Sequence, residues 1–91
     1  MNPVRWRPKA LEELARIVRR VSEENPIAAR QVGRELLLAG DSLSLFPYRG
    51  RVGRVPGTRE LVAYQPYIMV YRIATNGEVR ISRIWHGARN R

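Results

Sequence analysis

The second half of the chain carries the side chains that could do acid–base chemistry on a phosphate. Histidine is the side chain that most readily exchanges a proton near neutral pH, and His86 is the only one in the sequence. Glu60 could serve as a general base, and Arg59 beside it could stabilise a phosphate. Together they would permit RNA cleavage by its own 2′-OH, which needs no metal. A structural role for His86 and an ion pair between Glu60 and an arginine remain open alternatives.

A second set of residues could bind an anion. Residues 46–91 hold nine arginines and two acids, a balance of +7 within a chain of net charge +9. Such a field attracts nucleic acid, an acidic protein or an anionic surface, although a generally basic, solvated surface is the simpler alternative. The tyrosine at position 48 lies between Pro47 and an arginine, so we expect it to be exposed. The predicted binding surface comprises Tyr48, Arg49, Arg51, Arg54, Arg72, Arg83 and Arg89.

Several classes of function are disfavoured by the composition. The sequence has no cysteine, which excludes disulfides and thiolate–metal sites, and a lone histidine is not a metal site. It has no phosphate-binding glycine loop and no nucleophile elbow. We therefore expect neither a cofactor nor a metal. No apolar run is long enough to cross a membrane, and the first residues do not form a secretory signal, so we expect a cytoplasmic location.

The first half of the chain predicts one strand and two helices. Alternation at residues 4–7 indicates a short strand, and apolar residues then recur at helical spacing for roughly 16 residues after Pro8. Asn25 and Pro26 are typical of a helix cap and first turn, so a second helix follows at once, and the pair forms an antiparallel hairpin. We expect Gly40 to loosen or end this second helix, with Phe46-Pro47 as a firmer stop. The first helix buries a stripe of Leu11, Leu14, Ile17 or Val18, and Val21; the second buries Ala29, Val32, Leu36 and Ala39.

The second half predicts a sheet. Strand patterns cover residues 58–63, 68–74 and 79–86, with a further short strand possible around Val52. Asn76-Gly77 is a strong hairpin signal, and a bulge near Ser82-Arg83 would keep the last strand in phase with the core. We expect a single domain, residues 1–91, of the α+β class. Its antiparallel sheet of about four strands packs against the N-terminal helical hairpin, and arginines line the other face.

Six short motifs, taken in order, resemble one known family. The chain resembles the RelE/ParE superfamily of toxins from bacterial type II toxin–antitoxin modules. The resemblance implies the RelE/ParE-like toxin fold and a small basic toxin neutralised by an acidic cognate antitoxin in a toxin–antitoxin hetero-oligomer. The motifs are Trp6 with Ala10 and Leu14, then residues 25–29, 47–51, 57–61, 67–73 and 86–89.

The superfamily divides by target, and the resemblance favours one side. RelE-like members cut mRNA on the ribosome, whereas ParE-like members poison DNA gyrase. Arg59 and His86 match residues of the ribonuclease branch, but Gly87 stands where that branch has tyrosine. We therefore expect a ParE-like gyrase inhibitor, in which Arg59 and His86 would be structural or contact residues. The alternatives are a ribosome-dependent endoribonuclease that uses Arg59, Glu60 and His86, and a non-toxic basic nucleic-acid-binding module.

Overall fold

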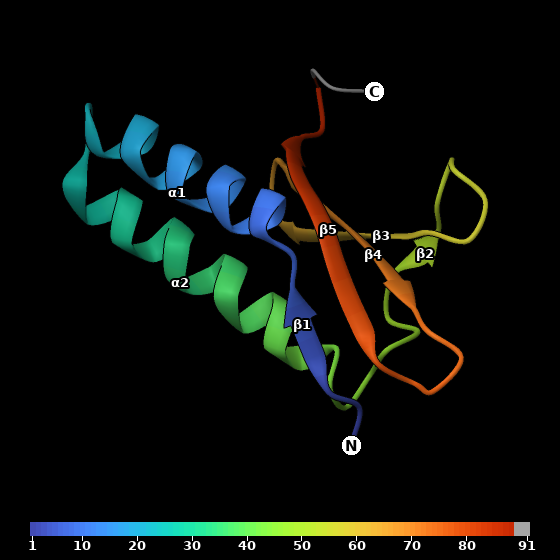
Figure 1. The fold of residues 1–91 in the computed structure, drawn as a ribbon. Coiled ribbons are helices and arrows are strands. Elements are labelled where there is room, and N and C mark those ends of the chain that lie inside the picture. Colours follow the sequence, from blue (N-terminus) through green and yellow to red (C-terminus); the bar gives the residue numbers. More distant parts are fainter. Residues whose placement is uncertain (89–91) are drawn as a thin grey trace.

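The computed structural model describes residues 1–88 as a helical hairpin packed on one face of a β-sheet (Figure 1). The far end of the hairpin, where the two helices meet, extends beyond the sheet. The elements in chain order are β1 (Val4–Trp6), α1 (Pro8–Ser22), α2 (Pro26–Ser42), β2 (Arg51–Val52), β3 (Arg59–Tyr64), β4 (Tyr67–Ile73) and β5 (Val79–His86).

Helix α2 begins as its sequence predicts. The Asn25 side chain accepts a hydrogen bond of 3.0 Å from the Ala28 N–H, and Pro26 occupies the first turn. An Asn cap satisfies a backbone donor that the helix itself cannot, and proline has no N–H to leave unpaired there. The predicted stripe of Ala29, Val32, Leu36 and Ala39 is buried.

Gly40 does not end α2, contrary to expectation, because the helix continues to Ser42. Gly40 is buried, and a Cβ added to it would collide with the Trp6 ring and lie 3.0 Å from Ile81 Cδ1. The glycine therefore lets the strands β1 and β5 approach the helix closely. Its role is in packing, which outweighs its modest cost in a helix interior.

Helix α1 buries only part of the predicted stripe. Leu11 is 47% exposed, whereas Ala10 is fully buried and Leu14 and Ile17 pack against the core. The buried face thus keeps Leu14 and Ile17 of the predicted stripe and has Ala10 in place of Leu11. Glu13 lies on this face and is only 7% exposed, so a carboxylate enters the interior.

The sheet has the strand order β1-β5-β4-β3-β2. The α+β class and the helical hairpin are confirmed, but the sheet has five strands and is mixed, because β1 runs parallel to β5 and the other pairs are antiparallel. The entire helical hairpin intervenes between β1 and the rest of the sheet, and a long connection of this kind permits parallel pairing. The two-residue β2 is the short strand that the sequence allowed near Val52.

The predicted bulge and turn are both present between β4 and β5. Val70 pairs with Arg83 and Tyr71 with Ile81, which leaves Ser82 as the extra residue. The bulge brings Ile81 and Ile84 to the same core cluster although they are three positions apart. In the turn, Gly77 has a φ of 90°, and the Asn76 side chain accepts a hydrogen bond of 3.0 Å from the Glu78 N–H.

The sheet face away from the helices carries a row of arginines. Arg5, Arg80 and Arg72 lie opposite one another on β1, β5 and β4, and all three are exposed. Glu78 accepts hydrogen bonds of 2.7 Å from Arg80 and 3.4 Å from Arg5. The bond from Arg80 holds the pKa of the Glu78 carboxyl below its usual value. Over the described residues, no helix is long and apolar enough to cross a membrane.

Candidate functional surfaces at two ends of the sheet

The basic segment, residues 47–57, is fixed to the sheet by Tyr71. This tyrosine of β4 is fully buried, and its hydroxyl donates a hydrogen bond of 2.7 Å to the Pro47 carbonyl. The same hydroxyl accepts one of 2.9 Å from the Gly50 N–H. A buried hydroxyl with both a donor and an acceptor partner is fully satisfied and holds the segment at two points.

Arg59 lies on the same side of the sheet as Tyr71, with which it pairs in register. Its Nη1 donates a hydrogen bond of 2.7 Å to the Gly50 carbonyl, and its guanidinium carbon lies 4.8 Å from the centre of the Tyr48 ring. At this distance the cation attracts the face of the ring. Tyr48 itself is 67% exposed, as its position beside Pro47 predicted.

Glu60 points to the opposite face of β3, as strand alternation predicts, yet it is only 4% exposed. Its carboxylate accepts hydrogen bonds of 3.0 Å from Arg51 Nη2 and 3.1 Å from the Arg54 N–H. The ion pair with an arginine, the alternative to a role as general base, is therefore the arrangement that the structure adopts. These two hydrogen bonds attach the basic segment to β3.

His86 lies at the other end of the sheet. It pairs with Tyr67 at the start of β4, whereas Arg59 pairs with Tyr71. These tyrosines are separated by four residues of extended strand, about 13 Å at 3.3 Å per residue. The rings of His86 and Tyr67 meet edge to face at 5.7 Å, and His86 Nδ1 accepts a hydrogen bond of 3.2 Å from the Ala88 N–H. The structure does not bring Arg59, Glu60 and His86 together.

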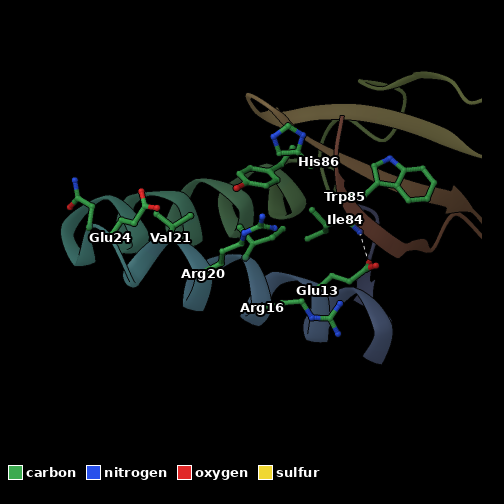
Figure 2. A pocket seen from close by; sticks show the side chains of 11 residues that line it. Glu13, Arg16, Arg20, Val21, Glu24, Ile84, Trp85 and His86 are labelled. Atoms are coloured by element: carbon green, nitrogen blue, oxygen red, sulfur yellow. Dashed lines mark hydrogen bonds between the residues drawn. The ribbon is translucent and has the colours of Figure 1, made fainter. Parts of the chain in front are cut away.

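A groove of about 440 Å³ opens beside His86, between the second half of α1 and the ends of β4 and β5. Figure 2 shows the arginines of α1 on one side of the groove and the aromatic residues of the strands on the other. Trp85 Nε1 is buried and has no hydrogen-bond partner among the described residues. The lining residues are Glu13, Arg16, Ile17, Arg20, Val21, Glu24, Asn25, Tyr67, Ile84, Trp85 and His86.

Glu13 closes one end of the groove and ties α1 to β5. Its carboxylate accepts hydrogen bonds of 2.8 Å from the Ile84 N–H and 2.8 Å from Arg83 Nε, and Arg83 Nη2 lies 2.7 Å from it (Figure 2 shows the first). The hydrogen bond to Glu13 and its charge raise the pKa of the Arg83 guanidinium above its usual value, against the effect of burial. Arg83 also lies 5.2 Å from the Trp85 ring, so this arginine has a structural contact on each side.

The predicted binding residues fall into three groups. Tyr48, Arg49, Arg51 and Arg54 lie on the basic segment, and Arg72 joins them through a hydrogen bond of 3.3 Å from its Nη1 to the Pro56 carbonyl. Arg83 lies apart, bonded to α1. Arg89 is outside the described residues. In the part of the chain that the structure describes, no three His, Cys, Asp or Glu side chains gather to hold a metal ion.

Sequence reasoning missed Tyr71 and Glu13, the two residues that fix these surfaces. The apolar pattern of the central strand predicts Tyr71 only as a core residue. No neighbouring residue indicates that its hydroxyl bonds Gly50 and Pro47, which lie 21 and 24 positions earlier. Glu13 did carry a signal. It lies three residues after Ala10 and one before Leu14, so it belongs to the apolar face of α1, where a carboxylate requires a partner.

Comparison with known proteins decides the family. The family model described as "ParE toxin of type II toxin-antitoxin system, parDE" matches residues 4–91. The chain belongs to the ParE toxin family. A solved chain described as "Chromosomal ParDE TA system from P. aeruginosa" superposes on this ParE-family toxin with a TM-score of 0.82 at 26% identity, covering 94% of this chain and 96% of that one.

Two curated relatives agree with this membership. The ParE-family toxin is 39% identical to "Toxin RelE2" of Caulobacter vibrioides over 89 residues, which cover 98% of this chain and 99% of the relative. It is 40% identical to "Putative toxin Y4kP" of Sinorhizobium fredii over 77 residues, 84% of this chain and 80% of the relative. The protein is thus a toxin of a type II toxin–antitoxin system, and its partner is a protein antitoxin.

Proposed function

We propose that this toxin inhibits growth by binding DNA gyrase and that it acts without catalysis. The observation that carries the proposal is the separation of His86 from Arg59 and Glu60. A general acid or base must come within hydrogen-bond reach of the atom it serves, roughly 3 Å. Arg59 and His86 lie beside opposite ends of β4, so the two side chains cannot both reach one phosphate.

The local contacts of the three residues support the same conclusion. Glu60 is buried and engaged by Arg51 and Arg54, so its carboxylate does not face a substrate. Arg59 donates one N–H to the Gly50 carbonyl, and its guanidinium lies over the Tyr48 ring. Gly87, which follows His86, offers no side chain that could act as an acid. Arg59 and Glu60 are therefore best understood as residues that shape the basic segment.

A supercoiling assay with the purified full chain tests the proposal. We expect the toxin to block supercoiling by gyrase or to accumulate cleaved DNA, and we expect His86→Ala to inhibit as well as the wild type. Normal supercoiling in the presence of excess folded toxin would refute gyrase as the target. Loss of inhibition in His86→Ala alone would instead give the histidine a direct role.

A ribosome-dependent endoribonuclease is the second candidate. It is supported by the name RelE2 of the Caulobacter relative and by the cationic basic segment, which could accept mRNA. Primer extension on translated mRNA after induction would then show cuts within codons, and Arg59→Ala and His86→Ala would abolish them. Intact mRNA in growth-arrested cells would exclude this activity.

We propose further that the antitoxin is acidic and occupies the groove beside α1. Ile17 and Val21 give the groove an apolar lining, and Arg16 and Arg20 contribute positive charge to it, with the acidic Glu24 near its end. An amphipathic segment with acidic residues on one side matches both features.

A further inference from the structure

Tyr48 presents one open aromatic face to solvent. It is 67% exposed, which is more than any other tyrosine of the chain. The Arg59 guanidinium covers one face of the ring, with its carbon 4.8 Å from the ring centre. The other face is therefore the one available to a ligand.

The ring stands on a rigid support. Arg59 Nη1 is bonded to the Gly50 carbonyl at 2.7 Å, and the Tyr71 hydroxyl is bonded to Gly50 and Pro47 at 2.9 and 2.7 Å. These bonds fix the backbone on both sides of Tyr48. A ring held in place before binding loses little conformational entropy when a ligand stacks on it.

The segment that carries the ring is positively charged. Residues 42–59 contain four arginines and no acidic residue. Arg49, Arg51 and Arg54 are exposed, and the nearest acid on the adjoining strand, Glu60, is buried and already paired with Arg51. Arg49 is steadied by a hydrogen bond of 2.7 Å from its Nη1 to the Ser42 hydroxyl, which leaves its other N–H groups for a ligand. The site is built for a planar ring attached to negative charge.

We propose that the basic segment binds an unpaired nucleic-acid strand, with one base stacked on the open face of Tyr48 and phosphates held by Arg49 and Arg54. Only an unpaired strand offers a base with a free face, whereas a duplex hides it. A strand also supplies one negative charge per nucleotide, which suits arginines spaced along a loop. The site is a property of the toxin alone, so it stands or falls independently of gyrase.

Fluorescence anisotropy with the full-length toxin tests the site. The probe is a labelled oligonucleotide of about 12 thymidines, close to the length that one small domain covers. We expect Tyr48→Ala and Tyr48→Leu each to weaken binding by about 5- to 150-fold, the range expected for the loss of one stacked base. Tyr48→Phe keeps the ring and should bind within about twofold of wild type.

Two matched variants separate stacking from charge. Tyr64→Ala removes a tyrosine at the other end of β3 and should leave binding unchanged. Arg54→Ala should weaken binding and lower the slope of log affinity against log salt by about 0.7, the value for one phosphate contact on a single strand. Melting temperatures establish that each variant is folded.

The probes also decide the kind of strand. Tighter binding of oligouridine would identify RNA as the ligand, and tighter binding of oligothymidine would identify DNA; either supports the proposal. Equal affinity of wild type and the two Tyr48 variants that lack a ring would overturn it, as would tighter binding of the corresponding duplex. If these variants weaken only the binding of the antitoxin, the ring belongs to a protein interface and the proposal fails.

Discussion

At the scale of single residues, Tyr71 does more than fill the core. Its ring is fully buried, and its hydroxyl is the point where the basic segment is attached to the sheet. Burial raises the pKa of the Tyr71 hydroxyl above the usual 10.0, and the hydrogen bond from Gly50 and the charges of Arg59 and Arg49 only partly offset that effect. The position of Tyr48 and Arg49 therefore depends on a hydroxyl that must stay protonated.

The raised pKa of Tyr71 predicts a loss of stability in alkali. The Tyr71 hydroxyl holds its proton more tightly in the folded state than in the unfolded state. Its contribution to the free energy of unfolding is therefore fully present below pH 10.0 and is lost as the pH rises through the raised pKa. Urea unfolding at pH 7 and above pH 10 measures this. Tyr71→Phe should be less stable at pH 7 by about 1–2 kcal/mol, because two backbone groups lose their partner. Above pH 10 it should decline less steeply than wild type; an equally steep decline would contradict the role of Tyr71.

At the scale of secondary-structure elements, one carboxylate connects the helical layer to the sheet. Glu13 bonds both the Arg83 side chain and the Ile84 N–H, immediately after the bulge at Ser82. The bulge turns this part of β5 toward α1. Because the groove lies between the same two elements, Glu13 also lines it.

We expect Glu13→Ala to lower the free energy of unfolding by about 1–3 kcal/mol. Most of this loss comes from the unsatisfied Ile84 N–H, since Arg83 is 41% exposed and its ion pair is partly screened by solvent. Glu13→Gln keeps an acceptor and should lose less. The exposed neighbour Glu12 provides the control, and Glu12→Ala should change stability by at most about 0.5 kcal/mol in the same urea titration. Equal effects at the two positions would show that the bonds from Arg83 and Ile84 to Glu13 do not stabilise the fold.

The features of the helices and strands that the sequence predicts are those set by residues close together in the chain. The Asn25 cap, the α2 stripe and the bulge depend on neighbours within a few positions, and all three were predicted. The continuation of α2 through Gly40, the exposure of Leu11 and the parallel β1 depend on what packs from elsewhere in the chain. Likewise, the separation of Arg59 from His86 follows from the register of β4 with both neighbours, which no single segment encodes.

At the scale of the whole molecule, positive charge lies on both candidate functional surfaces as well as on the open sheet face. The basic segment lies near Arg59, and the groove near His86 carries Arg16 and Arg20. An antitoxin in the groove would therefore not need to cover Tyr48. Long-range attraction from a net charge of +9 would speed its approach to either surface.

Charge reversal separates the groove from this general attraction. We expect Arg16→Glu combined with Arg20→Glu to raise the dissociation constant for the antitoxin at least about tenfold, because both lie on the groove wall. Arg19→Glu combined with Arg30→Glu changes net charge equally at exposed helical positions outside the groove, and should weaken binding by less than about threefold. Calorimetry with separately purified partners measures both. Equal losses of antitoxin affinity in the two double variants would show that the antitoxin does not bind in the groove.

The parallel pairing of β1 with β5 makes the order in which the chain folds depend on one long-range contact. β1 lies beside β5 at residues 79–81, and Asn2 donates a hydrogen bond of 2.7 Å to Gly77, 75 positions away. The first strand has no neighbour in the sheet until β5 has been made, because β5 is its only partner among the described strands. The closing of the sheet therefore requires contacts between segments far apart in the sequence, which is the kind of topology that slows folding.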